Sequence, residues 1–227
     1  SFSLKAGESL AIVGATGSGK STLINTLCQF YEIAKGDILF DGHSIKNINK
    51  YDLRRQIALV QQDVFLFSGS ILDNIRMGNQ QIGQEEIELI SHAVSSHNFI
   101  SNLPFKYEQE LNEDDISSGQ RQLLSFARAL AAEPKILVLD EATSNVDLET
   151  ERQIQKGIKE MTRGRTSIII AHRLSTLMHV DKVLVLKKGE VIEFGKRKEL
   201  LQQKGIFYQL CQTQIKLEQS LTDAEER

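Results

Sequence analysis

The sequence predicts an α/β fold in which helices cover both faces of a mostly parallel β-sheet. Short runs rich in β-branched residues alternate with segments of helical periodicity, and the runs "KILVLD", "TSIIIAH" and "KVLVL" are almost continuously apolar. Strands that are apolar on both sides are typical of parallel sheets buried between helices. The 227 residues, 41% of them hydrophobic and 25% charged, allow one large soluble domain or two small ones.

The first part of the chain is predicted to hold a strand, a helix, a hairpin and a second strand. "ESLAIVG" is a buried strand that ends in Gly14. A helix follows, because apolar side chains recur at helical spacing at Leu23, Ile24, Leu27 and Phe30. The Asp-Gly pair in "DILFDGHSI" lies between apolar runs, which indicates a hairpin, and "IALV" is the next strand.

The remainder divides into a helical part and a strand-rich part. From about Ser70 to Pro134 the pattern indicates mostly helices and loops. "ETERQIQKGIKEM" is a helix between the strands "KILVLD" and "TSIIIAH", and "KKG" is a turn between "KVLVL" and "EVIEF". The final stretch, "TQIKLEQSLTDAEER", is polar and is expected to fray.

Composition excludes several classes of function. The net charge of −3 offers no electrostatic reason to expect nucleic acid as a partner. Cys28 and Cys211 lie far apart without metal-ligand spacing, which indicates free thiols in a reducing cytosol. No apolar run approaches the roughly 20 residues that a membrane-spanning helix needs. We therefore expect that this chain does not cross a membrane by itself.

The segment Gly14–Thr22, "GATGSGKST", matches a phosphate-binding loop between a strand and a helix. Its glycines let successive N–H groups converge on phosphate oxygens, Lys20 would reach the β- and γ-phosphates, and the Ser21 hydroxyl would ligate Mg²⁺. A plain glycine-rich turn is the alternative, and the flanking strand and helix disfavour it. The predicted contact residues are Gly14, Ala15, Thr16, Gly17, Ser18, Gly19, Lys20, Ser21 and Thr22.

Polar residues follow three of the apolar runs, where ligands bind at the edge of an α/β sheet. Asp140 would hold Mg²⁺ through water and Glu141 would orient the attacking water, although two acids can also cap the next helix. His172 would contact the γ-phosphate, against the alternative of a structural histidine. Gln62 would ligate the metal or hold water, and Gln61 is nearly as plausible from spacing alone.

A second phosphate cradle is predicted at "ISSGQRQLLSFARAL", Ile116 to Leu130. Small polar residues and a glycine before an amphipathic helix leave backbone N–H groups available to an anion. One domain seldom needs two phosphate-binding sites. The question is therefore which molecule's phosphate the second cradle binds.

Together these residues resemble the ATP-binding cassette family, over essentially the whole chain and in the family's order. The phosphate loop is similar to its Walker A motif, Gln62 to its Q-loop, Ile116–Gln120 to its signature, Asp140-Glu141 to Walker B, and Ser144–Asp147 to its D-loop. His172 matches the switch histidine.

The resemblance implies a P-loop NTPase (RecA-like) core with an N-terminal antiparallel β part and an inserted helical subdomain. It places the core at about 1–69 and 134–214, the helical subdomain at about 70–133, and a polar tail at 215–227. It also implies an ATPase that binds ATP and Mg²⁺, with metal contacts from Ser21, Gln62 and Asp140 and catalytic roles for Glu141, His172, Lys20 and Gln62.

In that family two cassettes stack head to tail around two ATP molecules. The resemblance thus assigns Ser117, Ser118, Gly119 and Gln120 to the ATP of a second cassette, with Asp147 in the D-loop. The stretches "VQQDVFLFSGSILDNI" and "SSGQRQLLSFARAL" are similar to the exporter branch, whose cassettes are fused to membrane domains. Phe65–Ser70 is then expected to meet the coupling helices of that membrane domain, at the cytoplasmic face of the membrane.

Three departures from the family pattern matter. Family members carry an upstream aromatic that stacks on adenine, a contact worth about 1–3 kcal/mol; we expect the chain to be N-terminally truncated and to bind ATP more tightly once those residues are restored. The signature reads ISSGQ, with Ser118 in place of a glycine. The preceding "ELNEDD" stands where many exporters have a Gly-Glu pair and puts acids near the partner's phosphates, which is mildly unfavourable. Intact Glu141 and His172 beside an irregular signature resemble one half of a heterodimeric exporter.

Alternatives to the exporter motor stay open at this point. A homodimer and a heterodimer are both compatible with the motifs. A soluble cassette acting on nucleic acid or ribosomes is disfavoured by the acidic net charge. A non-catalytic regulatory cassette is disfavoured by Glu141, which degenerate cassettes commonly lose. The transported substrate is not encoded in these residues.

Overall fold

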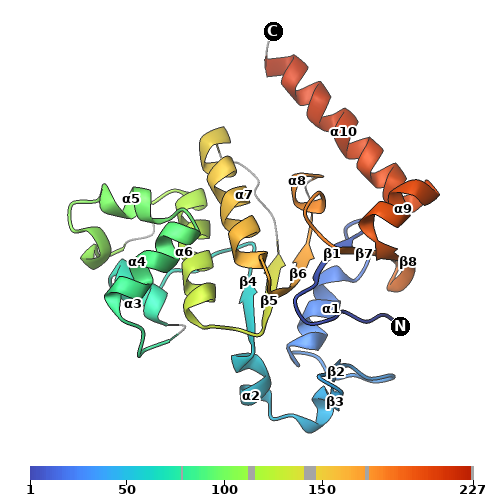
Figure 1. Ribbon diagram of the computed structural model, residues 1–227, viewed down its shortest axis with the longest axis horizontal. Coiled ribbons are helices and arrows are strands. Elements are labelled where there is room, and N and C mark those ends of the chain that lie inside the picture. The colour runs from blue at the N-terminus through green and yellow to red at the C-terminus, as the bar shows by residue number, and fades with distance from the viewer. Residues whose placement is uncertain (78, 112–115, 141–146, 172–173, 226–227) are drawn as a thin grey trace.

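The computed structural model describes residues 1–77, 79–111, 116–140, 147–171 and 174–225. Its centre is a six-stranded sheet with the strand order β4-β5-β6-β1-β7-β8 (Figure 1). The neighbouring pairs from β4 to β7 are parallel and β8 is antiparallel to β7, so the predicted α/β fold is confirmed. The strands are β1 Ser9–Val13, β4 Ile57–Val60, β5 Ile136–Asp140, β6 Thr166–Ile170, β7 Lys182–Lys187 and β8 Glu190–Lys196.

The register brings the carboxyl ends of four parallel strands to one level. Ile12 of β1 and Asp140 of β5 are both paired with Ile170 of β6, and Val60 of β4 is paired with Leu139 of β5. The chain therefore leaves β1, β4, β5 and β6 along the same edge of the sheet. This is the edge where ligands bind in open α/β sheets.

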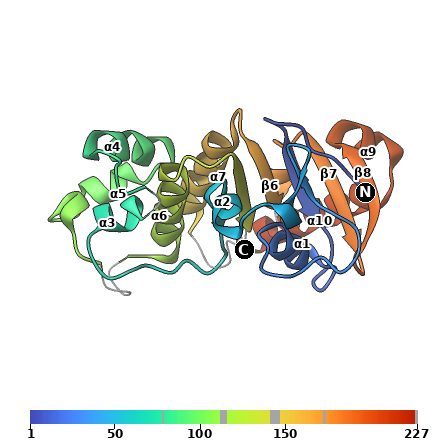
Figure 2. The same ribbon diagram turned by 90° about the horizontal axis from the view of Figure 1, so that it is seen from below.

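Alternate residues of the five parallel strands enter two separate hydrophobic cores. One core packs Leu10, Ile12 and Leu184 against α1 (Lys20–Leu27) and α2 (Lys50–Arg55). The other packs the intervening positions, such as Ala11, against α6 (Ser118–Ala131), α7 (Leu148–Thr162), α8 (Leu174–Leu177), α9 (Arg197–Gln203) and α10 (Ile206–Glu225). Both faces of the parallel strands are thus covered by helices, which explains why these strands are almost continuously apolar (Figure 2).

A helical lobe lies beyond β4, at the end of the sheet opposite β8 (Figure 1). Its elements are α3 Ile71–Arg76, α4 Gln84–Ala93, α5 His97–Ser101, the 3₁₀ turn η2 Lys106–Glu108, and α6. Helix α6 is the centre of the lobe, because it packs against α3, α4 and α7 and also against β4. The proposed boundaries at residues 69, 133 and 214 stay predictions.

The predicted hairpin forms a small separate sheet of β2 (Leu39–Phe40) and β3 (His43–Ser44), followed by the 3₁₀ turn η1 (Ile45–Asn47). Asp41 and Gly42 both have positive φ, 49° and 81°, as a two-residue hairpin turn requires. Lys188 and Gly189 have the same property between β7 and β8, at φ 50° and 81°. Among the described residues no helix combines the length and apolarity needed to span a bilayer.

Two details of the helix predictions are wrong. Helix α1 ends at Leu27, so Phe30 lies outside it, half-exposed, with the Arg54 guanidinium 4.6 Å from its ring centroid. The final segment does not fray into coil, because α10 continues to Glu225. The Glu193 carboxylate accepts hydrogen bonds from the N–H groups of Ile206 and Phe207 and so satisfies the start of α10. The Gln, Lys, Glu and Leu residues that follow are good helix formers.

Candidate functional site

The phosphate loop connects β1 to α1 and depends on glycine at its tightest points. A Cβ atom on Gly14 would lie 2.2 Å from the Leu186 carbonyl oxygen and 2.7 Å from Ser18 Oγ, so no side chain fits there. Gly19 caps α1 at φ 101°, a left-handed conformation that favours glycine, and no side chain caps the helix. The N–H groups of the first turn of α1 therefore remain available to phosphate oxygens.

The loop is also held from outside by the hairpin between β7 and β8. The Gly189 N–H donates to the Ser18 carbonyl oxygen at 2.9 Å. Ser18 Oγ is buried and has no hydrogen-bond partner among the described residues. Buried polar groups usually have a hydrogen-bond partner. An unpaired buried hydroxyl is therefore consistent with a loop in which a bound ligand supplies that partner. The sequence indicated this hairpin but not its contact with the loop.

Lys20 lies inside the loop that it would serve. The residue is only 7% exposed, and its Nζ donates to the carbonyl oxygens of Gly14 at 2.8 Å and Ala15 at 3.2 Å. Burial lowers the pKa of this ammonium, and the negative charge of Asp140 opposes that shift. The ammonium is thus pre-positioned within the cradle, where a phosphate could replace the two carbonyl oxygens. Ser21 and Thr22, in the first turn of α1, are exposed.

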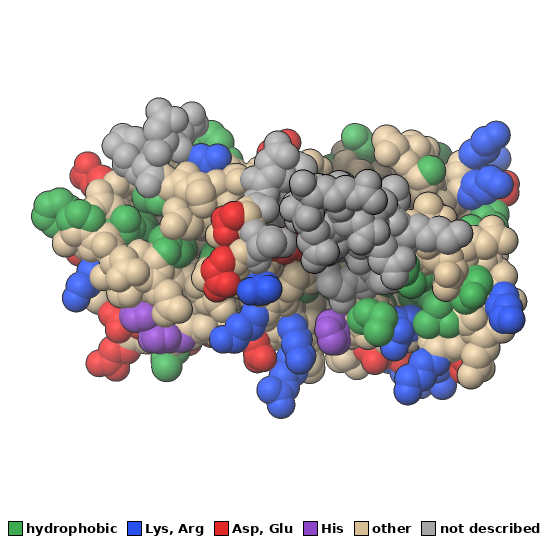
Figure 3. Space-filling view, turned by 90° about the horizontal axis from the view of Figure 1, so that it is seen from above, with side chains coloured by type: hydrophobic (Ala, Val, Ile, Leu, Met, Phe, Trp, Pro, Cys, Tyr) green, Lys and Arg blue, Asp and Glu red, His purple; other side chains and the backbone are tan. Residues whose placement is uncertain are grey.

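The remaining predicted residues of the same site follow β4, β5 and β6. Asp140 is half-buried at the end of β5, and its charge acts on Lys20, which places the two groups in one site. Gln61 and Gln62 follow β4 and are exposed. Glu141 and His172 lie outside the described residues, so their roles stay predictions. Figure 3 shows the molecule from this side, and the acidic and basic side chains that it colours are interspersed and form no single basic patch.

The second cradle begins helix α6, as the sequence predicted. Ser117 and Gln120 form a capping box: the Gln120 N–H donates to Ser117 Oγ at 3.2 Å, and the Ser117 N–H donates to Gln120 Oε1 at 2.9 Å. Ser117 and Ser118 are exposed, Gly119 is buried and Gln120 is half-buried. The helix is anchored by buried side chains, which include Leu123, Leu124, Ala127 and Leu130.

The two cradles do not face each other within one chain. Helix α1 lies on the face of β1, whereas α6 lies in the lobe beyond β4, with β5 and β6 between them (Figures 1 and 2). The start of α6 and the phosphate loop are therefore separated by two strands of the sheet.

Asp147 caps the helix that follows the predicted D-loop. Its Oδ1 accepts the Thr150 N–H at 2.9 Å, and this hydrogen bonding lowers the pKa of the exposed carboxyl. Residues 144–146 lie outside the described residues, as do four residues of the acidic run before the signature, 112–115. Among the described residues no group of three or more His, Cys, Asp or Glu side chains is arranged to hold a metal ion.

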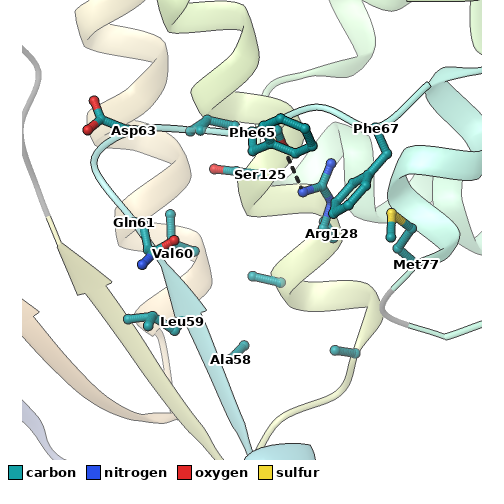
Figure 4. Close-up of a pocket in the computed structure, with 13 residues that line it drawn as sticks. Ala58, Leu59, Val60, Gln61, Asp63, Phe65, Phe67, Met77, Ser125 and Arg128 are labelled. Atoms are coloured by element: carbon teal, nitrogen blue, oxygen red, sulfur yellow. Dashed lines mark hydrogen bonds between the residues drawn. The ribbon is translucent and has the colours of Figure 1, made fainter. Parts of the chain in front are cut away.

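A hollow of about 390 Å³ beside β4 contains the residue that sequence reasoning missed, Arg128 (Figure 4). It lies between β4, the loop after it and α6, and the exposed rings of Phe65 and Phe67 stand at its rim. Arg128 donates to backbone and side-chain oxygens of the loop and of α3. Burial lowers the pKa of its guanidinium. The available signal was an arginine within "SFARAL", among residues that pack into the core.

Comparisons with known proteins agree with these motifs. A family model described as ABC transporter matches residues 1–144. "Uncharacterized ABC transporter ATP-binding protein YfiC" of Bacillus subtilis is 46% identical over 216 residues, which cover 94% of this chain and 36% of that protein. The "ATP-dependent lipid A-core flippase" of Syntrophus aciditrophicus is 42% identical over 217 residues, 95% of this chain and 36% of the flippase.

A third relative, also from Bacillus subtilis, is named "Probable multidrug resistance ABC transporter ATP-binding/permease protein YheH". It is 45% identical over 216 residues, which cover 94% of this chain and 32% of that protein. The chain thus spans about a third of the length of the curated relatives it matches.

Proposed function

The chain belongs to the ABC transporter family and is one of its ATP-hydrolysing domains, and from this premise we propose that it is the motor of a membrane exporter. It would form a head-to-tail dimer with a second cassette around two ATP molecules. The observation that carries the proposal is the pair of cradles, one built around Lys20 and one starting α6, placed on opposite sides of β5 and β6.

Each chain's own ATP would be held by the loop from Gly14 to Thr22. The first-turn N–H groups of α1 would bind the phosphate oxygens, and the Lys20 ammonium would move from the Gly14 and Ala15 carbonyl oxygens to the β- and γ-phosphates. Ser21 and Gln62, with Asp140 through water, would hold Mg²⁺, because hydroxyl, amide and carboxylate oxygens are the ligands it prefers. When bound, the ion neutralises charge on the phosphates.

Hydrolysis would depend on residues that follow β5 and β6. We assign Glu141 to the orientation and polarisation of the attacking water, and His172 to the γ-phosphate. The Ser117 hydroxyl and the N–H groups at the start of α6 would meet the same γ-phosphate from the partner chain. The positive end of the α6 dipole favours an anion at this position.

The membrane partner would contact the loop between β4 and α3. Phe65 and Phe67 are 63% and 41% exposed there, beside the hollow of about 390 Å³. An exposed pair of rings next to a hollow is typical of a docking surface. One relative's name joins an ATP-binding part to a permease, and the relatives are about three times as long as this chain. We infer a fused membrane domain, with the cassette at the cytoplasmic face of the membrane.

The test is the mass of the Glu141→Gln variant in solution with and without Mg-ATP. We expect hydrolysis to be abolished and an ATP-dependent dimer to appear, because ATP then stays trapped between two chains. The double variant Glu141→Gln with Lys20→Ala is the control and should stay monomeric. Absence of hydrolysis by the unmodified chain would contradict the motor. Trapped ATP on a persistent monomer would contradict a homodimer and favour a distinct partner cassette.

A further inference from the structure

The loop between β4 and α3 consists of two halves that are held differently. Among the described residues, the side chains of Gln61, Gln62 and Asp63 make no hydrogen bond or ion pair, and all three are exposed. The second half, from Phe65 to Ser70, is tied to the helical lobe at several points. The Leu111 N–H donates to the Gly69 carbonyl oxygen at 3.1 Å.

Arg128 provides the connection between this second half and α6. Its guanidinium donates to three acceptors: the Phe65 carbonyl oxygen at 3.1 Å, the Asn74 carbonyl oxygen at 2.9 Å and Asn74 Oδ1 at 2.8 Å. Its Cζ atom also lies 5.2 Å from the Phe67 ring centroid (Figure 4). One side chain of α6 thus contacts the loop, the ring of Phe67 and the middle of α3.

Asn74 extends the same network. It is 1% exposed, its Oδ1 accepts the Phe67 N–H at 2.9 Å, and its Nδ2 donates to the carbonyl oxygens of Phe67 at 2.8 Å and Ser70 at 3.0 Å. Because Asn74 is buried and fully paired, it gives Arg128 a rigid acceptor. A planar guanidinium suits three fixed acceptors, whereas a lysine ammonium on a flexible stem does not.

We propose that Arg128 is a positioning residue that fixes Phe65–Ser70 to helix α6. When this loop is displaced, the helix beginning at Ser118 moves with it, and the backbone bends at Gln61–Val64. The inference rests on the proposed function, since Gln62 would serve the chain's own ATP and Ser118 the partner's. Gln62 and Ser118 line one hollow of about 320 Å³, so the distance across it depends on where this loop is held.

The consequence is a coupling between the two ATP sites of a dimer that runs through one chain. Moving the Phe65–Ser70 half together with α6 changes the position of Ser118 relative to Gln62 without disturbing the loop from Gly14 to Thr22. Arg128 should therefore influence the closed, hydrolysing state and leave initial ATP binding nearly unchanged.

The test compares Arg128→Lys and Arg128→Met with the unmodified full chain. We expect kcat for ATP to fall roughly tenfold or more in both variants, because a misplacement of about 1 Å can cost up to about 10²-fold, while KM changes less than about twofold. Arg152→Lys is the matched control: that arginine lies on α7 with a 79% exposed side chain and should show no effect. A kcat for Arg128→Lys equal to that of the unmodified chain would overturn the proposal, because positive charge alone would then suffice.

A second measurement needs no variant. Hydrogen exchange on the unmodified chain should show the Phe67 amide protected to the same degree as the amides of α6, and both should respond together when Mg-ATP is added. Exchange at Phe65–Ser70 as fast as at residues 61–63 would overturn the proposal even if the variants fold poorly. Inactivity of the unmodified chain would instead contradict the proposed function, so the two failures are distinguishable.

Discussion

The helices α1 and α6 both begin at a proposed phosphate cradle, but their first turns are built in different ways. Helix α1 starts at Gly19, which has no side chain to cap it, and Lys20 is buried against the loop's own carbonyl oxygens. Helix α6 starts with a complete capping box between Ser117 and Gln120. The first cradle leaves its N–H groups to a ligand, whereas the second already satisfies two of its own.

This difference agrees with different proposed roles for the two sites, one binding nucleotide and the other completing the site of a second chain. The α1 cradle would surround a phosphate with backbone from one chain and a buried cation, as proposed for a site that binds nucleotide alone. The α6 cradle presents the Ser117 hydroxyl and few free N–H groups on an exposed surface, which agrees with the proposal that another chain carries the phosphate to it.

The largest expected effect tests whether the α1 cradle is the primary site. Replacing Lys20 by Ala removes the buried ammonium, and we expect ATP hydrolysis to fall by about 10²-fold or more, as for other groups that stabilise charge on a transferred phosphoryl. Steady-state phosphate release measures this. Lys198→Ala, an exposed lysine of α9, is the control. Hydrolysis within a few-fold of the unmodified rate would refute the role of Lys20.

The next effect tests whether close packing, rather than glycine content, shapes the loop. Gly14→Ala places a Cβ atom against the Leu186 carbonyl oxygen. We expect the free energy of unfolding to fall by about 2–3 kcal/mol, and we expect ATP binding to be lost as well. At Gly17 a Cβ meets nothing within 4 Å, so only the cost of its positive φ remains, about 1 kcal/mol. Urea unfolding and nucleotide titration of both variants measure the difference. Equal losses would show that the contact with Leu186 is unimportant.

The smallest effect separates the two roles of Ser117. Ser117→Ala should cost about 1 kcal/mol of stability, because the cap of α6 is lost. Ser117→Asp keeps a good capping residue but places a negative charge beside the partner's phosphate. We expect this variant to keep its thermal midpoint and to lose the ATP-dependent dimer. A dimer that survives Ser117→Asp would mean that the start of α6 does not contact phosphate.

Much of the fold followed from local patterns. The apolar runs predicted β1, β4, β5, β6 and β7, since a strand buried on both faces has few polar positions. β8, which is largely exposed, followed from the run "EVIEF" after the turn "KKG". Glycine spacing located the phosphate loop, and the small polar residues at Ser117 located the start of α6, because helix and turn chemistry depends on residues near in sequence. Apolar periodicity predicted helix ends less reliably. Phe30 fits the spacing of α1 but lies beyond its end at Leu27. The start of α10 is stabilised by Glu193, which is distant in sequence.

Tertiary structure alone decided which groups meet across the chain. Three contacts join residues that are 63 or more positions apart: that of Gly189 with Ser18, the packing of Gly14 against Leu186, and the hydrogen bond from Arg128 to Phe65. Such contacts depend on strand order and register, which alternating apolar patterns do not specify. The sequence by itself therefore determined the residue types of each proposed cradle, and the order of strands decided that the two cradles lie on opposite sides of β5 and β6.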